Sequence, residues 1–180
     1  VLKAADGTTV FIDPYLGTGD PPRTVRMIPI PFAPEDVPEA DAVLATHEHT
    51  DHTHGPSQAP ILAGTDATFY GPKAAVDTAD GWIEEFDLST DDIVQLTEGR
   101  TIDVGSLSIH VEAAYDPDAE SPVSYVVEHD SGTFFHGGDS RPAPDAFGVV
   151  ADAFDIDVGA LSLGSVGNVY DPDAGHVERS

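Results

Sequence analysis

The sequence contains no cysteine. Disulfide bonds, thiolate metal ligands and a cysteine nucleophile are therefore excluded. Basic residues are also scarce, because 7 Lys and Arg stand against 33 Asp and Glu, for a formal net charge of −26. Nucleic acids carry dense negative charge, and their binding rests largely on cationic side chains. We therefore expect no nucleic-acid partner.

Long hydrophobic runs are missing as well. No apolar stretch approaches the roughly 20 residues that cross a bilayer, and no basic-then-apolar signal segment opens the chain. We expect no membrane partner and a cytoplasmic location. Hydrophobic residues still make up 40% of 180 residues, which is enough for one substantial core. We predict a single domain over residues 1–180, and the sequence leaves a homo-oligomer open.

The carboxylates are spread along the whole chain and do not form an acidic tail. Asp87, Asp91 and Asp92, for example, flank the apolar residues of an ordinary core segment. This distribution is typical of a surface adapted to concentrated salt, in which repulsion between carboxylates is screened. We favour a halophilic protein of a salt-accumulating microbe. The alternative is an ordinary acidic protein that binds a basic partner.

Four of the eight histidines lie in residues 47–54, which we name the histidine loop. A predicted buried strand at residues 41–46 leads directly into this loop. Imidazole and carboxylate groups suit zinc, manganese or iron. A solvated loop that is merely rich in histidine would not explain the pattern HxHxDH, which fixes four positions at once. We predict a metal site, and its first candidate ligands are His47, His49, Asp51 and His52.

Periodicity and turn residues predict the remaining elements. Strands are expected at residues 8–12, 67–70, 93–96, 101–104, 106–114, 123–128, 133–136 and 157–163. Helices are expected at residues 56–63, 72–78 and 145–154, and residues 15–40 read as a long surface loop. Strands dominate and helices lie between some of them. The fold class is therefore α/β (α+β), with helices on the outer faces of a sheet sandwich.

Two further polar groups follow predicted strands. Asp139 lies in His136-Gly137-Gly138-Asp139-Ser140, where the glycines let the backbone approach a neighbour closely. A Gly-Gly-Asp segment alone is more often a turn, but beside the histidine loop Asp139 is a candidate carboxylate bridging two metals. Asp13 precedes Pro14 at another strand end. It either hydrogen-bonds a ligand imidazole or simply ends the strand in an Asp-Pro turn.

Together these motifs resemble the metallo-β-lactamase fold and, more narrowly, its L-ascorbate-6-phosphate lactonase-like branch. The resemblance covers most of the chain. The matching segments are Ile12-Asp13-Pro14-Tyr15-Leu16, Ala45-Thr46-His47-Glu48-His49-Thr50-Asp51-His52, Gly138-Asp139-Ser140 and residues 157–165.

The resemblance implies an αββα sandwich with two divalent metal ions, Zn or Mn, on its rim. It assigns His47 and His49 to one metal, Asp51 and His52 to the other, and places Asp139 between them. Asp116 stands where the superfamily has a further histidine and where this branch tends to have aspartate. His110 competes with Asp116 for this role, but a histidine in mid-strand is more often structural.

Both ends of the chain depart from the family pattern. The first strands of the family are largely absent before Val1, so the fold is expected to be partial. The last metal-binding histidine of the family lies after another helix and strand beyond Ser165. His176, in the remaining tail, falls too early to replace it. We therefore expect a partial fold and a weakly bound second metal.

The predicted activity is that of a metal-dependent hydrolase. A hydroxide shared by two metals would attack a small ester, lactone or phosphoester metabolite, with Asp51 as a ligand and as the group that orients the hydroxide. The candidate substrate contacts are Arg141, Ser165 and Asn168. His54 is interpreted as a surface residue, with a proton shuttle as the alternative. Two other functions stay open: a nuclease or phosphodiesterase of the same fold, and a non-catalytic metal-binding remnant.

Overall fold

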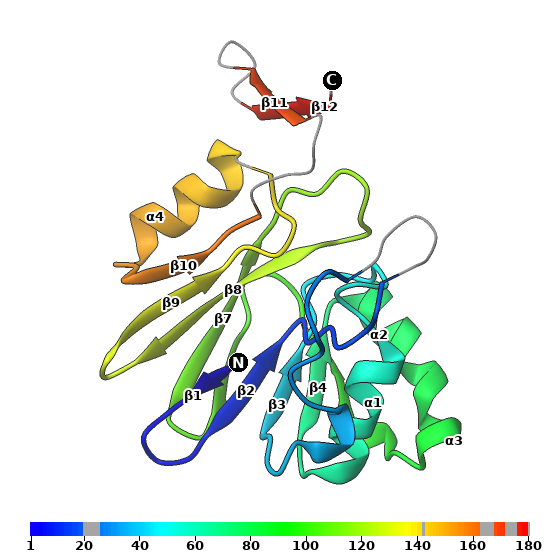
Figure 1. Ribbon diagram of the computed structural model, residues 1–180. Helices are drawn as coiled ribbons and strands as arrows, with labels where there is room; N and C mark the ends of the chain where they lie inside the picture. Colours follow the sequence, from blue (N-terminus) through cyan, green and yellow to red (C-terminus); the bar gives the residue numbers. More distant parts are fainter. Residues whose placement is uncertain (20–25, 142, 163–167, 172–175, 180) are drawn as a thin grey trace.

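The computed structural model describes residues 1–19, 26–141, 143–162, 168–171 and 176–179, and two five-stranded sheets form its body (Figure 1). The first sheet has the order β1-β2-β3-β4-β5. Its strands are β1 (Leu2–Lys3), β2 (Thr9–Ile12), β3 (Ala42–Leu44), β4 (Thr68–Gly71) and β5 (Ile93–Gln95). Strands β2 to β5 are parallel, and β1 is antiparallel to β2. The carboxyl ends of four strands therefore lie at one edge.

The second sheet has the order β10-β9-β8-β7-β6. Its strands are β6 (Thr101–Val104), β7 (Leu107–Ala113), β8 (Val123–His129), β9 (Gly132–His136) and β10 (Val158–Ala160). Strands β6 to β9 form an antiparallel meander, and β10 is parallel to β9. A separate two-stranded sheet consists of β11 (Asn168–Asp171) and β12 (His176–Arg179).

Helices cover the outer face of each large sheet (Figure 1). The first sheet carries α1 (Gly55–Gly64), α2 (Lys73–Ala79) and α3 (Ile83–Phe86), with the short 3-10 turns η1 (Pro34–Asp36), η2 (Asp80–Trp82) and η3 (Thr90–Asp92). The second sheet carries α4 (Val149–Ala153), which continues from the π-helical turn η4 (Pro144–Gly148). These four layers confirm the predicted αββα sandwich.

Strand alternation explains why the layers stack in this way. In β3, Ala42 and Leu44 point into the core between the sheets, and Val43 points toward the helices. All three are fully buried, as expected for a parallel strand covered on both faces. A buried leucine or valine side chain contributes about 1.5–3 kcal/mol. The histidine loop therefore follows a strand that is fixed on both sides.

Most predicted elements are present with boundaries shifted by a few residues. Strand β3 ends its regular pairing at Leu44, two residues before the predicted end, because the Thr46 N–H donates to the Asp13 side chain. The predicted helix at 145–154 begins as a π-helical turn, and α3 was not predicted. Across the described ranges, none of the helices is both long enough and apolar enough to span a bilayer.

Candidate metal centre

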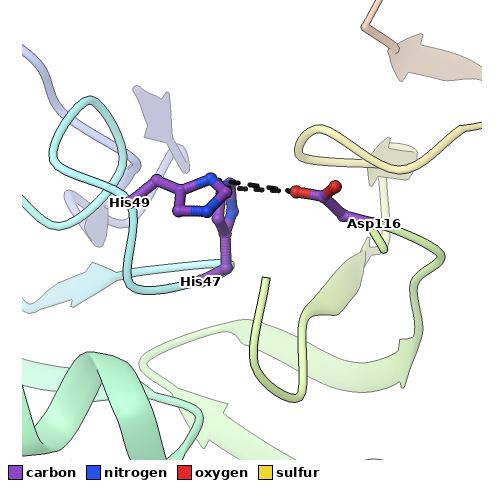
Figure 2. Close-up of side chains that lie close together, drawn as sticks. All are labelled: His47, His49 and Asp116. Atoms are coloured by element: carbon purple, nitrogen blue, oxygen red, sulfur yellow. Dashed lines mark hydrogen bonds and ion pairs between the residues drawn. The ribbon is translucent and has the colours of Figure 1, made fainter. Parts of the chain in front are cut away.

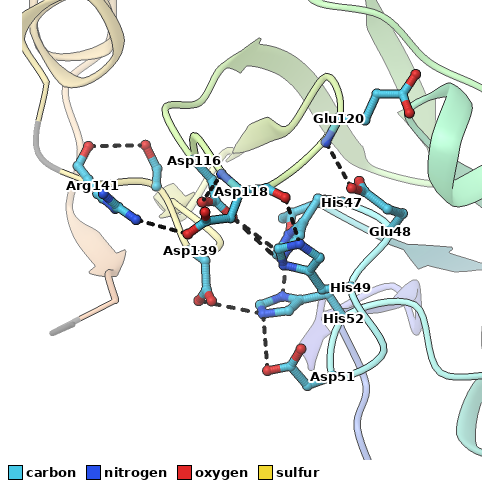
Figure 3. Close-up of polar contacts among 12 residues, drawn as sticks. His47, Glu48, His49, Asp51, His52, Asp116, Asp118, Glu120, Asp139 and Arg141 are labelled. Carbon is cyan, nitrogen blue, oxygen red and sulfur yellow. Dashed lines mark hydrogen bonds and ion pairs between the residues drawn. The ribbon is translucent and has the colours of Figure 1, made fainter. Parts of the chain in front are cut away.

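The candidate ligands come from strand ends that meet at one rim of the sandwich (Figure 3). Asp13 follows β2 and the histidine loop follows β3, both in the first sheet. Asp116 follows β7 and Asp139 follows β9, both in the second sheet. Residues far apart in the sequence are thus brought together because the two sheets pack face to face.

The first group consists of His47, His49 and Asp116 (Figure 2). His47 Nε2 lies 2.9 Å from His49 Nδ1. The Asp116 Oδ2 atom lies 3.9 Å from His47 Nε2 and 3.8 Å from His49 Nδ1. The Asp116 side chain is only 8% exposed. Two imidazole nitrogens and one carboxylate face a common point, so these residues fit a divalent transition metal.

The second group consists of His47, His52 and Asp139. His52 Nε2 lies 3.5 Å from Asp139 Oδ1, and the rings of His47 and His52 have centroids 4.0 Å apart. In both groups the ligand atoms lie within 4.8 Å of one another. This donor set also fits a divalent metal. The buried His47 therefore belongs to both groups, which the family-based assignment did not foresee.

Asp51 lies beside the second group but not within it. Its side chain is 68% exposed, and its Oδ2 atom lies 3.8 Å from His52 Nε2 (Figure 3). The carboxylate faces the cavity described below. The role of Asp51 as a metal ligand stays a prediction, and its position suits a group that contacts water.

Asp13 lies behind the ligands and is only 6% exposed. Its Oδ1 accepts the Thr46 N–H at 2.8 Å, and its Oδ2 accepts the Thr46 hydroxyl at 2.7 Å. The same Oδ2 lies 2.8 Å from His52 Nδ1. Because a carboxylate can only accept, the His52 proton is held on Nδ1, which leaves Nε2 free for a metal.

Thr46 extends this arrangement to His47. Its hydroxyl donates to Asp13, so its oxygen can accept the Nδ1 proton of His47 at 3.0 Å. His47 Nε2 is then free for a metal. His49 is oriented the other way round, because its Nε2 donates to the Asp118 carbonyl at 3.1 Å. Its Nδ1 is the free nitrogen, and it is the atom that faces the first group.

Charge and burial act differently on the imidazoles of the metal-free protein. Burial, followed by the neighbouring histidines, lowers the pKa of His47 and favours the neutral ring. Burial also lowers the pKa of His52, but the hydrogen bonds and charges of Asp13 and Asp139 outweigh it and raise this pKa to about 10. The hydrogen bond from His52 lowers the pKa of Asp139.

Arg141 contacts the loop that carries Asp116 (Figure 3). Its Nη2 donates to Asp118 Oδ2 at 3.1 Å, and its backbone N–H donates to the Tyr115 carbonyl at 2.8 Å. The Ser140 hydroxyl accepts the Tyr115 N–H at 2.9 Å. Arg141 therefore joins the Asp139 turn to the Asp116 loop. Its predicted contact with substrate stays a prediction.

The remaining sequence candidates divide into two sets. Ser165 and the side chains of Asn168 and His176 lie outside the described part of the chain. His110 is remote from both groups and lies 2.7 Å from Glu128, as expected for a structural histidine. His54, predicted at the surface, is instead partly buried, with Nδ1 2.6 Å from the Ser57 hydroxyl.

Gly138 is the one position of the Asp139 turn where only glycine fits. Its φ of 55° lies in the left-handed region. A Cβ atom there would lie 2.8 Å from Thr46 Oγ1 and 2.9 Å from Thr46 Cβ. The close approach expected from the sequence is therefore an approach to Thr46, and it brings Asp139 to the histidine loop.

A cavity of about 290 Å³ opens beside the second group. Its lining residues are Ile12, Asp13, Asp51, His52, His136, Gly138, Asp139, Ala160, Leu161 and Ser162. His136 was not predicted as a site residue. Its signal was present in the sequence, because it ends a predicted strand three residues before Asp139. Burial lowers the pKa of His136.

Comparisons with known proteins identify the family of this chain. A family model described as "Beta-lactamase superfamily domain" matches residues 8–177. The "Probable L-ascorbate-6-phosphate lactonase UlaG" of Escherichia fergusonii is 27% identical over 183 residues, which cover 78% of this chain and 51% of the relative. The UlaG protein of an Escherichia coli strain is 26% identical over the same coverage. The chain thus spans about half the length of the curated relatives it matches.

Solved structures show the same fold. CmlA, a diiron beta-hydroxylase from Streptomyces venezuelae, has a TM-score of 0.64 at 22% identity, over 85% of this chain and 30% of CmlA. An isothiocyanate hydrolase from Delia radicum gut bacteria has a TM-score of 0.60 at 19% identity, over 83% of this chain and 62% of the hydrolase. The resemblance to the lactonase-like branch is confirmed by the curated relatives. Since the family model covers nearly all of the sequence, the chain belongs to the beta-lactamase superfamily.

Proposed function

We propose that the chain acts as a metal-dependent hydrolase of a small ester or lactone. One observation carries the proposal: two ligand groups share His47 and lie beside a cavity of about 290 Å³. The groups adjoin at His47, so cations held by them would lie close enough to act on one substrate, with His47 Nε2 bound to one of the two. The name of the curated lactonase relatives supports the choice of a lactone or ester over a phosphodiester.

Zinc or manganese is the metal proposed for both groups. When bound, two such cations would supply activation of water for attack on a carbonyl carbon and offset the charge that develops on its oxygen. The residues of the chain then have separate tasks. The metals would be held by His47, His49, Asp116, His52 and Asp139. Asp13 keeps the proton of His52 on Nδ1. Asp51, exposed at the mouth of the cavity, orients the attacking water and accepts its proton.

Metal removal and Asp51→Asn test this function. Dialysis against a chelator should abolish hydrolysis of a lactone and ester panel, and added zinc or manganese should restore it. Asp51→Asn should lower kcat by about 10²–10⁴-fold, the usual contribution of a general base. Metal content should change little, because Asp51 lies outside both compact groups. Elemental analysis and steady-state kinetics give both quantities.

Glu84→Gln is the matched control, because it removes an exposed carboxylate on α3, away from the rim. Its kinetics should equal those of the wild type. Hydrolysis that persists after chelation would rule out the proposed chemistry. Bound metal without hydrolysis of any panel member would favour the non-catalytic alternative, and selective cleavage of phosphodiesters would favour the nuclease alternative.

We also propose that the protein works in concentrated salt, as in the cytoplasm of a salt-accumulating cell. The exposed carboxylates Glu84, Glu85, Asp87 and Asp91 cluster around α3 and η3. In the described ranges, lysine offsets acidic charge in the pairs Lys3–Glu39 and Lys73–Asp77. The surface repulsion is therefore largely uncompensated, and salt should stabilise the fold by screening it.

A thermal melt in potassium chloride tests this expectation. Raising the salt from dilute buffer to several molar should raise Tm by on the order of 10 °C, equivalent to a few kcal/mol for a chain of this size. The double variant Glu84→Lys/Glu85→Lys should show a smaller rise, because it reduces the repulsion directly. Equal melting temperatures in dilute and concentrated salt would contradict the halophilic interpretation.

A further inference from the structure

The cavity beside the second group has two kinds of wall. One wall is acidic and carries Asp13, Asp51 and Asp139. The other is mostly apolar, with Ile12 from β2 and Ala160 and Leu161 from the end of β10. Neither lysine nor arginine is among the described residues that line it. Arg141, which follows the Asp139 turn, donates to Asp118 outside this lining.

His136 supplies a hydrogen-bond donor to this cavity. It is the last residue of β9, and its Nδ1 accepts the N–H of Gly138 at 3.2 Å. A ring nitrogen that accepts carries no proton, so the proton of the neutral ring is on Nε2. Asp13 Oδ2 lies 4.0 Å from Nδ1, which is too long for a competing hydrogen bond.

The Nε2 atom of His136 has a proton to donate and, within the described ranges, no protein acceptor for it. Nε2 is also not one of the polar atoms that are fully buried without a hydrogen-bond partner, so solvent can reach it. His136 is 21% exposed and lines the cavity. The donor is therefore accessible to a molecule bound there, only three residues from the candidate ligand Asp139.

We propose that His136 donates from Nε2 to an oxygen of the bound substrate, and that the cavity selects an uncharged ester or lactone over a phosphorylated one. This inference rests on the proposed hydrolase function. The apolar wall accommodates the carbon skeleton, and His136 orients the acyl group beside Asp139 and His52. Asp139 would hold a metal and Asp13 is paired with His52, but Asp51 is exposed in the cavity, and its described walls offer a phosphate neither lysine nor arginine.

A matched pair of lactones tests the choice of substrate. The zinc-loaded protein is assayed with glucono-δ-lactone and with its 6-phosphate. The kcat/KM for the uncharged lactone should be at least about tenfold higher, since the phosphate would lie near Asp51 and meet no lysine or arginine from the described walls. A preference for the phosphorylated lactone would overturn the inference and leave the proposed hydrolase intact.

Variants of His136 test the donor. His136→Phe keeps a ring without an N–H and should lower kcat/KM about 10–100-fold, the loss expected for one hydrogen bond to substrate. His136→Gln retains an N–H donor and should recover part of the loss. Zinc stoichiometry should stay unchanged in both, and His110→Gln on the outer face should behave as wild type. Loss of zinc in His136→Phe, or unchanged kcat/KM, would refute the role of donor.

A binding measurement separates this inference from the proposed function. The uncharged lactam δ-valerolactam resembles a lactone but resists hydrolysis, so it can be titrated into zinc-loaded protein by NMR. The His136 ring signals should shift, and the affinity should fall at least about tenfold in His136→Phe. If the wild type hydrolyses no lactone, the hydrolase proposal fails, and this titration alone tests whether His136 donates to a bound molecule. Absence of lactam binding to the wild type would then overturn the inference as well.

Discussion

Alanine at position 47 is expected to release one metal and to weaken the other. His47 belongs to both ligand groups, and its side chain is buried between the rings of His49 and His52. Within the described residues each group has three candidate ligands, so the metal bound to His47 Nε2 would keep two. The other metal would be weakened because the ring that packs against His52 is lost. The bound zinc, measured by elemental analysis after dialysis, should fall from about two equivalents to one or less.

The other ligands should divide into two classes. His49→Ala and Asp116→Ala should each weaken only the first metal, because these residues occur only in the first group. His52→Ala and Asp139→Ala should each weaken only the second. Isothermal titration with zinc would then show, for each of the four variants, a loss of affinity at one site and an unchanged affinity at the other.

Two controls test whether the loss of zinc comes from the loss of a ligand. Circular dichroism should show an intact fold in the His47→Ala variant, and His110→Ala should keep two equivalents because His110 pairs with Glu128 away from the rim. If the His47→Ala variant retains two tight equivalents, His47 is not a ligand, and the metals are held by the other candidates, including Asp51 as in the family-based assignment.

Most of the candidate ligands were predictable because they occupy local patterns. The segment from His47 to His52 provides three imidazoles within six residues after a strongly apolar strand. Asp139 follows two glycines at another strand end, and the structure brings it to His52. Strand ends are predictable from short-range periodicity, and ligands that follow them directly gather at the same rim of the sandwich.

The supporting contacts were not predictable in the same way. Contacts between Thr46 and Asp13 and between Arg141 and Asp118 join loops separated by 33 and 23 residues. Their geometry depends on how the two sheets pack, and no local sequence pattern predicts this packing. Asp116 required a family resemblance, because an Asp-Pro segment in a loop carries no metal signal of its own. The position of His136 at a strand end was visible in the sequence, but the donor role proposed for it depends on a hydrogen bond from the backbone of Gly138.

Asp13→Asn should have the second large effect, although Asp13 touches neither metal position. Asparagine matches aspartate in size and tolerates the left-handed φ of 46° at this position. The fold should therefore survive. Zinc affinity should fall about 10–100-fold, the usual cost of losing a hydrogen-bond partner behind a metal ligand.

The reason lies in the direction of two hydrogen bonds. The Thr46 N–H donates to Oδ1 of Asp13, so the asparagine oxygen must stay there and its NH₂ must replace Oδ2. That NH₂ would then face His52 Nδ1, which lies 2.8 Å from Oδ2 of Asp13 in the wild type. A metal on His52 Nε2 requires the ring proton on Nδ1, so two N–H groups would oppose each other. The Thr46 hydroxyl would also stop donating to position 13, which disturbs its contact with His47.

Three measurements check this account. Zinc titration should show both metals weakened, because His52 and His47 are both affected, whereas Asp41→Asn, at the other end of β3, should bind zinc normally. NMR titration of the metal-free variant should show the pKa of His52 below its value of about 10, because the negative charge of Asp13 helps to raise it. Unchanged zinc affinity together with an unchanged pKa of His52 would show that Asp13 only ends the strand, which is the alternative that its Asp-Pro sequence left open.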